Sequence, residues 1–81
     1  MDIAIYTTPS CPFCRQAKEF LTERKVPYVE YNVADDEVRR EEMIEKSGQY
    51  GVPVIEIGGE IIVGFDKIRL EEALDQPQLK F

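Results

Sequence analysis

The chain has 81 residues, enough for one domain, and we expect residues 1–81 to form a single one. Its net charge of −6 argues against nucleic acid or an anionic membrane surface as the main partner, because both need a basic face. The chain contains no histidine, which excludes Ser–His–Asp triads, Cys–His nucleophile pairs and histidine-ligated metal sites.

The sequence carries no sign of membrane insertion or secretion. No apolar run approaches the ~20 residues of a membrane-spanning helix. Met1 is followed at once by a strand-like run, without a basic region and an apolar stretch. We therefore expect a cytoplasmic protein, in which two cysteines stay reduced unless a substrate oxidises them.

The first half of the chain predicts a strand, a helix and a second strand. A nearly continuous apolar run over residues 3–6 is typical of a central strand. A helix follows, with Ser10 as its expected cap and Pro12 in its first turn. Alternation over residues 26–33 predicts the second strand, and Pro27 at its start favours an edge position. The apolar face expected for the helix consists of Phe13, Ala17, Phe20 and Leu21.

The second half predicts a helix, a hairpin and a last helix. Three acidic residues at 35–37 favour a helix start, and Gly48 follows the expected helix end. Two β-rich runs, 52–57 and 60–63, are joined by two glycines, a strong hairpin signal. Asp66 is the expected cap of the last helix, which Pro77 would end. The apolar face expected for this helix consists of Ile68, Leu70, Ala73 and Leu74.

The order of elements is therefore β-α-β-α-β-β-α. The first β-α-β unit should be parallel, whereas the hairpin must be antiparallel. We expect an α/β domain with a four-stranded mixed sheet flanked by helices.

The two cysteines, Cys11 and Cys14, stand at the junction of the first strand and the first helix. Unpaired N–H groups and the positive end of the dipole stabilise a thiolate at a helix start, so Cys11 is the predicted nucleophile. Arg15 and Lys18 add modest positive potential. Cys14 lies one turn further, on the same face, and should be less exposed. It is the predicted resolving thiol, which would close a disulfide with Cys11.

Three other interpretations of the Cys-X-X-Cys pattern stay open. A purely structural disulfide across so short a loop would stabilise little. A zinc site would need further ligands from carboxylates or from a partner chain, so no metal site is expected. Inert buried cysteines are common, but the position at a helix start beside Pro12 disfavours them here.

Over essentially its whole length the chain resembles a glutaredoxin of the thioredoxin fold. The resemblance implies a glutathione-dependent disulfide oxidoreductase that reduces glutathione mixed disulfides and protein disulfides. It also implies glutathione as co-substrate, no tightly bound cofactor and a monomer. The matching segments are Ile5-Tyr6-Thr7, Cys11-Pro12-Phe13-Cys14, residues 40–44 with Ser47-Gly48, Val52-Pro53 and Gly64-Phe65-Asp66.

The resemblance also implies a substrate site. Pro53 would be a cis-proline facing the active-site loop, and would present the Val52 backbone to a bound thiol peptide like an added strand. Asp66 and the two residues before it would bind the γ-glutamyl end of glutathione. Ordinary alternatives are a strand-start proline for Pro53 and a helix cap for Asp66. The implied binding residues are Pro12, Phe13, Val52, Pro53, Gly64, Phe65 and Asp66.

Departures from the family pattern keep two alternatives open. Thr8 stands where glutaredoxins often carry a lysine that grips glutathione, and Arg39, Arg40 or Gln49 could compensate. The Gly64-Phe65 pair resembles the one in the glutaredoxin-like hydrogen donors to ribonucleotide reductase. Those proteins are recycled by thioredoxin reductase. The other alternative is a [2Fe–2S]-binding module between two chains, which a proline after the first cysteine disfavours.

Overall fold

The computed structural model describes residues 2–75, which contain the predicted β-α-β-α-β-β-α order. Pro77, the expected end of the last helix, lies outside these residues. None of the helices described is long and apolar enough to cross a membrane. The elements are β1 (Ile3–Thr7), α1 (Pro12–Glu23), β2 (Val29–Asn32), α2 (Glu37–Ser47), β3 (Val54–Ile57), β4 (Glu60–Val63) and α3 (Lys67–Asp75).

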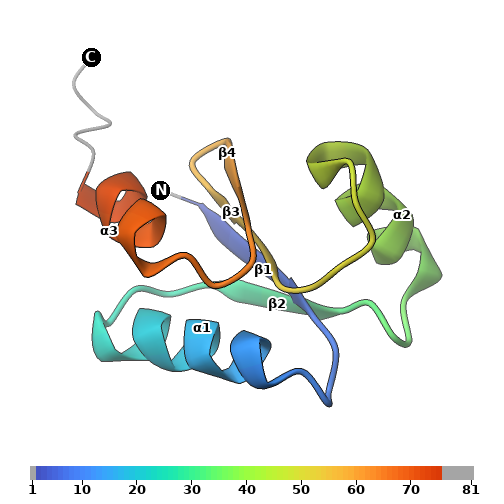
Figure 1. The fold of residues 1–81 in the computed structure, drawn as a ribbon, viewed down its shortest axis with the longest axis horizontal. Coiled ribbons are helices and arrows are strands. Elements are labelled where there is room, and N and C mark those ends of the chain that lie inside the picture. Colours follow the sequence, from blue (N-terminus) through green and yellow to red (C-terminus); the bar gives the residue numbers. More distant parts are fainter. Residues whose placement is uncertain (1, 76–81) are drawn as a thin grey trace.

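The four strands form one mixed sheet in the order β2-β1-β3-β4. β1 pairs with β2 in parallel, whereas β3 runs antiparallel to both β1 and β4. β2 lies at an edge, as Pro27 indicated. Figure 1 shows α1 and α3 on one side of the sheet and α2 on the other. The architecture is the mixed sheet that the sequence predicted and the thioredoxin-like fold that the family resemblance implied.

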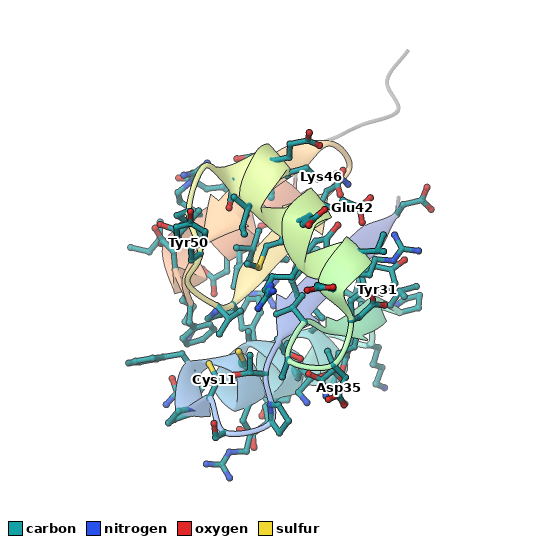
Figure 2. The ribbon with its side chains drawn as sticks, turned by 90° about the vertical axis from the view of Figure 1, so that its right-hand side faces the viewer. Cys11, Tyr31, Asp35, Glu42, Lys46 and Tyr50 are labelled. Carbon is teal, nitrogen blue, oxygen red and sulfur yellow. The ribbon has the colours of Figure 1, made fainter. Side chains whose placement is uncertain are left out.

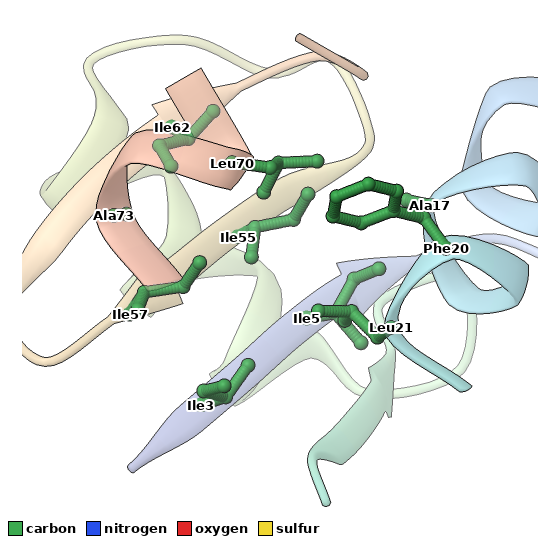
Figure 3. Packing of buried hydrophobic residues seen from close by; sticks show 10 residues of the cluster. All are labelled: Ile3, Ile5, Ala17, Phe20, Leu21, Ile55, Ile57, Ile62, Leu70 and Ala73. Atoms are coloured by element: carbon green, nitrogen blue, oxygen red, sulfur yellow. The ribbon is translucent and has the colours of Figure 1, made fainter. Parts of the chain in front are cut away.

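Side chains of each strand alternate between the two faces, and this alternation builds two cores. The face toward α1 and α3 carries the larger cluster, drawn in Figure 3. The face toward α2 carries a smaller cluster centred on Tyr6, Met43 and Val54. Because β1 and β3 contribute to both clusters, they hold the two layers of helices in register. The larger cluster consists of Ile3, Ile5, Ala17, Phe20, Leu21, Ile55, Ile57, Ile62, Leu70 and Ala73.

Both ends of α2 match the sequence prediction. Asp36 is the N-cap, and its Oδ1 accepts a hydrogen bond of 3.1 Å from the backbone N–H of Arg39. Gly48 ends the helix with φ of +76°, a left-handed conformation that glycine adopts without strain. These local signals place α2 between β2 and β3.

The predicted apolar faces of α1 and α3 each include one residue that the structure leaves exposed, so the prediction was wrong for these two. Phe13 is 59% exposed and Ile68 is 69% exposed. In the first turn of α1 the inward position belongs to Cys14, which leaves the neighbouring Phe13 in solvent. In α3 the inward positions are taken by Leu70 and Ala73.

We predict that Leu70→Ala destabilises the fold by about 2–5 kcal/mol, because it leaves a cavity where α3 packs on the sheet. Ile68→Ala, on the exposed side of the same helix, is the matched control and should stay within about 0.5 kcal/mol of the parent. Urea unfolding followed by circular dichroism measures both. Equal effects of the two substitutions would contradict this packing of α3.

Candidate active site

Cys11 is the N-cap of α1, directly before Pro12 at the first helical position. Its backbone is extended, with φ −99° and ψ 110°, and its Sγ accepts a hydrogen bond of 3.1 Å from the backbone N–H of Cys14. The prediction of Ser10 as the cap was therefore wrong. The reason is that a cysteine sulfur can accept the hydrogen bond that a cap oxygen normally takes. The sulfur of Cys11 thus lies at the positive end of the helix.

The backbone of Val52 faces the sulfur of Cys11 from the other side. The carbonyl oxygen of Val52 lies 3.9 Å from Sγ of Cys11. The Val52–Pro53 peptide bond is cis, as the family resemblance implied. The backbone N–H of Gly64 donates a hydrogen bond of 2.8 Å to the carbonyl of Pro53, which brings the end of β4 to the same place.

The two cysteines differ sharply in their surroundings. Cys11 is partly exposed, whereas Cys14 is only 1% exposed, and both are free. Burial, together with the hydrogen bond to Cys11, raises the pKa of the Cys14 thiol to about 12. Cys14 therefore stays protonated at neutral pH, and the exposed Cys11 is the thiol that a substrate can reach.

The residues from Gly64 to Asp66 form the turn between β4 and α3 and stabilise the fold there. Gly64 has φ of +80°, which favours glycine. The ring of Phe65 packs edge-on against Phe20 at 6.1 Å between centroids. Asp66 caps α3, since its Oδ1 accepts a hydrogen bond of 3.2 Å from the backbone N–H of Arg69. The glutathione-binding role of these residues stays a prediction.

A pocket of about 220 Å³ opens beside both cysteines. Among residues 2–75, Arg15 is a lining cation without a carboxylate partner. Lys18, on the next turn, is instead bound to Glu30 on β2. No local pattern predicts a role for Glu30, because this contact depends on the packing of α1 against β2. The pocket is lined by Thr8, Pro9, Ser10, Cys11, Pro12, Cys14, Arg15 and Lys18.

The two arginines of α2 are paired with glutamates of their own helix. Arg39 is paired with Glu42 at 2.8 Å and lies over the ring of Tyr31 at 4.1 Å. Arg40 lies 3.7 Å from Glu37 on the same helix. Figure 2 shows Tyr31 and Glu42 on the side of α2 away from Cys11. Both arginines therefore belong to solvated surface contacts of α2.

Metal ligands do not gather in the part of the chain that the structure describes. Within it, no three His, Cys, Asp or Glu side chains come together where they could hold a metal ion. The two thiols of one chain are the sulfur ligands available at this site.

Comparison with known proteins places this geometry in a family. Residues 3–62 match the family model described as glutaredoxin. A glutaredoxin-like 8.6 kDa protein encoded in the rubredoxin operon of Clostridium pasteurianum is 49% identical over 91% of this chain and 99% of its own length. Glutaredoxin 3 of Escherichia coli K12 is 37% identical over 83% of this chain and 81% of its own.

Solved structures agree with the sequence comparisons. The glutaredoxin-like protein NrdH-redoxin from Escherichia coli superposes with a TM-score of 0.79 at 25% identity, over 89% of this chain and 93% of that one. The family model spans most of the chain, and the Cys-X-X-Cys pair stands at the start of α1. The chain therefore belongs to the glutaredoxin family.

Proposed function

We propose that the protein is a glutathione-dependent oxidoreductase in which Cys11 attacks disulfides and Cys14 resolves protein mixed disulfides. Thiol–disulfide exchange itself follows from membership of the glutaredoxin family. One observation carries the assignment of roles. Cys11 is accessible and its sulfur accepts a helix-start N–H, whereas Cys14 is buried and protonated.

The proposed reaction begins when the Cys11 thiolate attacks the glutathionyl sulfur of a glutathionylated protein. A bond forms between Cys11 and that sulfur, the original disulfide breaks, and the protein thiol leaves. A second glutathione then attacks, which frees Cys11 and releases glutathione disulfide. With a protein disulfide, Cys14 attacks the mixed disulfide on Cys11 and completes the reduction.

Three features support glutathione as the co-substrate. The backbone of Val52 stands beside Cys11, where a thiol peptide can pair with it like an added strand. Arg15 lines the pocket beside Cys11 and supplies positive charge for a carboxylate. The carboxylate of Asp66, in an exposed residue at the start of α3, would bind the ammonium group at the γ-glutamyl end.

A second candidate is reduction by thioredoxin reductase without glutathione. Thr8 stands where the family often has a glutathione-binding lysine, and Gly64-Phe65 matches the ribonucleotide-reductase donors. NrdH-redoxin, whose fold superposes on this chain, has a thioredoxin-like activity profile. The proline of Cys11-Pro12-Phe13-Cys14 favours the glutathione-linked function.

We expect turnover of a glutathionylated peptide with NADPH, glutathione and glutathione reductase, measured as NADPH consumption. Asp66→Asn should raise the KM for glutathione about tenfold, because the charge is lost. It should leave the melting temperature unchanged, since asparagine caps helices as well as aspartate. Turnover with thioredoxin reductase alone, and none with glutathione, would replace this proposal by the second candidate.

Cys14→Ser should keep deglutathionylation and lose the reduction of protein disulfides, because only the second reaction needs a resolving thiol. Cys11→Ser should lose both activities. The two substrates are assayed in parallel, with the glutathionylated peptide and with insulin as the protein disulfide. Loss of deglutathionylation in Cys14→Ser would overturn the division of roles.

The reactivity of Cys14 should depend steeply on pH. Its pKa is raised to about 12, so its thiolate is a minor species that increases tenfold per pH unit at every pH below that value. In Cys11→Ser, we therefore expect the rate of iodoacetamide alkylation to keep rising from pH 7 to pH 10. A plateau before pH 9 would show that burial does not hold the proton on Cys14.

A further inference from the structure

Three polar side chains from three elements meet at the carboxylate of Glu30. Lys18 on α1 donates to Oε2 of Glu30 on β2, with Nζ at 2.9 Å. Thr7, at the end of β1, donates to the same oxygen at 2.7 Å and is only 2% exposed. Glu30 is thus held by a buried hydroxyl and in turn holds the ammonium group of Lys18. The catalytic steps described so far use none of these three residues.

Lys18 is placed to act on Cys14. It follows Cys14 by four residues in α1, so both side chains lie on the same face of the helix. Both also line the pocket beside the active-site loop. The hydrogen bond from Thr7 is the main cause that lowers the pKa of Glu30, which therefore stays ionised and fixes Lys18 as a cation.

The thiolate of Cys14 is favoured by groups other than its own backbone N–H. Its own backbone N–H is directed to the sulfur of Cys11. Burial raises the pKa of Cys14, whereas a hydrogen bond with the backbone of Thr8 and, to a smaller extent, the charge of Lys18 lower it. The charged or titratable neighbours are Cys11 and Arg15 around the pocket, and Glu30 and Tyr28 around Lys18. Among the cations of α1 that line the pocket, Lys18 lies one turn beyond Cys14 on the same face of the helix.

We propose that Lys18 stabilises the Cys14 thiolate in the resolving step, and that Glu30 and Thr7 act as positioning residues for Lys18. This inference rests on the proposed roles of Cys11 and Cys14. In the step, the Cys14 thiolate attacks the Cys11 sulfur of the mixed disulfide. The Cys11–Cys14 bond forms, the bond to the substrate sulfur breaks, and the departing thiolate takes up the proton that Cys14 released to solvent.

In the proposed role, Lys18 affects attack by Cys14 and not attack by Cys11. Another role of Lys18 would affect both steps. Attack by Cys11 depends on the helix start, whereas attack by Cys14 depends on Lys18. A merely structural role for the Thr7–Glu30–Lys18 contact would change folding and both steps alike. Loss of Lys18 should therefore slow the resolving step selectively.

The test is a stopped-flow reaction of the reduced protein with 4,4′-dithiodipyridine, a neutral disulfide whose approach does not depend on charge. Attack by Cys11 releases one equivalent of thiopyridone at a rate proportional to reagent concentration. Attack by Cys14 on the mixed disulfide releases the second equivalent of thiopyridone, at a rate that does not depend on reagent concentration. Lys18→Met should slow the second phase severalfold at pH 7 and leave the first unchanged, because a smaller fraction of Cys14 is then thiolate.

Three comparisons make the result specific. Lys18→Arg keeps the charge and should restore the second phase, and Lys25→Met, a charge loss after the end of α1, should match the parent. Because removing the cation raises the pKa of Cys14, the rate–pH curve of Lys18→Met should shift to higher pH. Thermal melting checks that each variant is folded.

An unchanged second phase in Lys18→Met, or equal slowing of both phases, would overturn the proposal. So would a failure of Lys18→Arg to restore the rate. The roles of the cysteines are tested separately in the same experiment. If Cys11 is not the attacking thiol, the Cys11→Ser variant will still show a fast first phase, with or without Lys18.

Discussion

The hydrogen bond from the backbone N–H of Cys14 to Sγ of Cys11, 3.1 Å long, determines how the two cysteines divide their chemistry. It places the first sulfur where the helix can stabilise a thiolate. It also directs the backbone N–H of Cys14 to the sulfur of Cys11 and away from the sulfur of Cys14. Cys14, buried one turn into α1, is left as a protonated thiol, and the proposed role of Lys18 is to help to activate it. The same contact therefore distinguishes the predicted nucleophile from the buried thiol.

The sheet sets the distances around this contact. β1 ends at Thr7 and leads into the loop with Cys11, while the chain enters β3 through Val52 and Pro53. Because β1 and β3 are neighbours, the carbonyl of Val52 comes to 3.9 Å from the sulfur of Cys11. Gly64, at the end of β4, is joined to Pro53 by a backbone hydrogen bond. Residues more than forty positions apart are brought together by strand pairing alone.

The sequence predicted what local patterns control. The order of elements, the edge position of β2 and both ends of α2 follow from periodicity, proline, glycine and acidic residues near Asp36. The exposure of Phe13 and Ile68 could not be predicted, because an apolar residue in the first turn of a helix can face either way. The cis bond before Pro53 was expected only from the family resemblance. The contact of Thr7, Glu30 and Lys18 joins three separate elements and has no local signal.

The central claim is that substrates attach to Cys11 first. It can be tested directly by mixing the reduced protein with one equivalent of glutathione disulfide, quenching with acid after milliseconds, and locating the glutathionyl group by fragment mass spectrometry. We predict that the earliest adduct lies on Cys11 and gives way to the Cys11–Cys14 disulfide. An early adduct on Cys14, or equal labelling of both cysteines, would contradict the account.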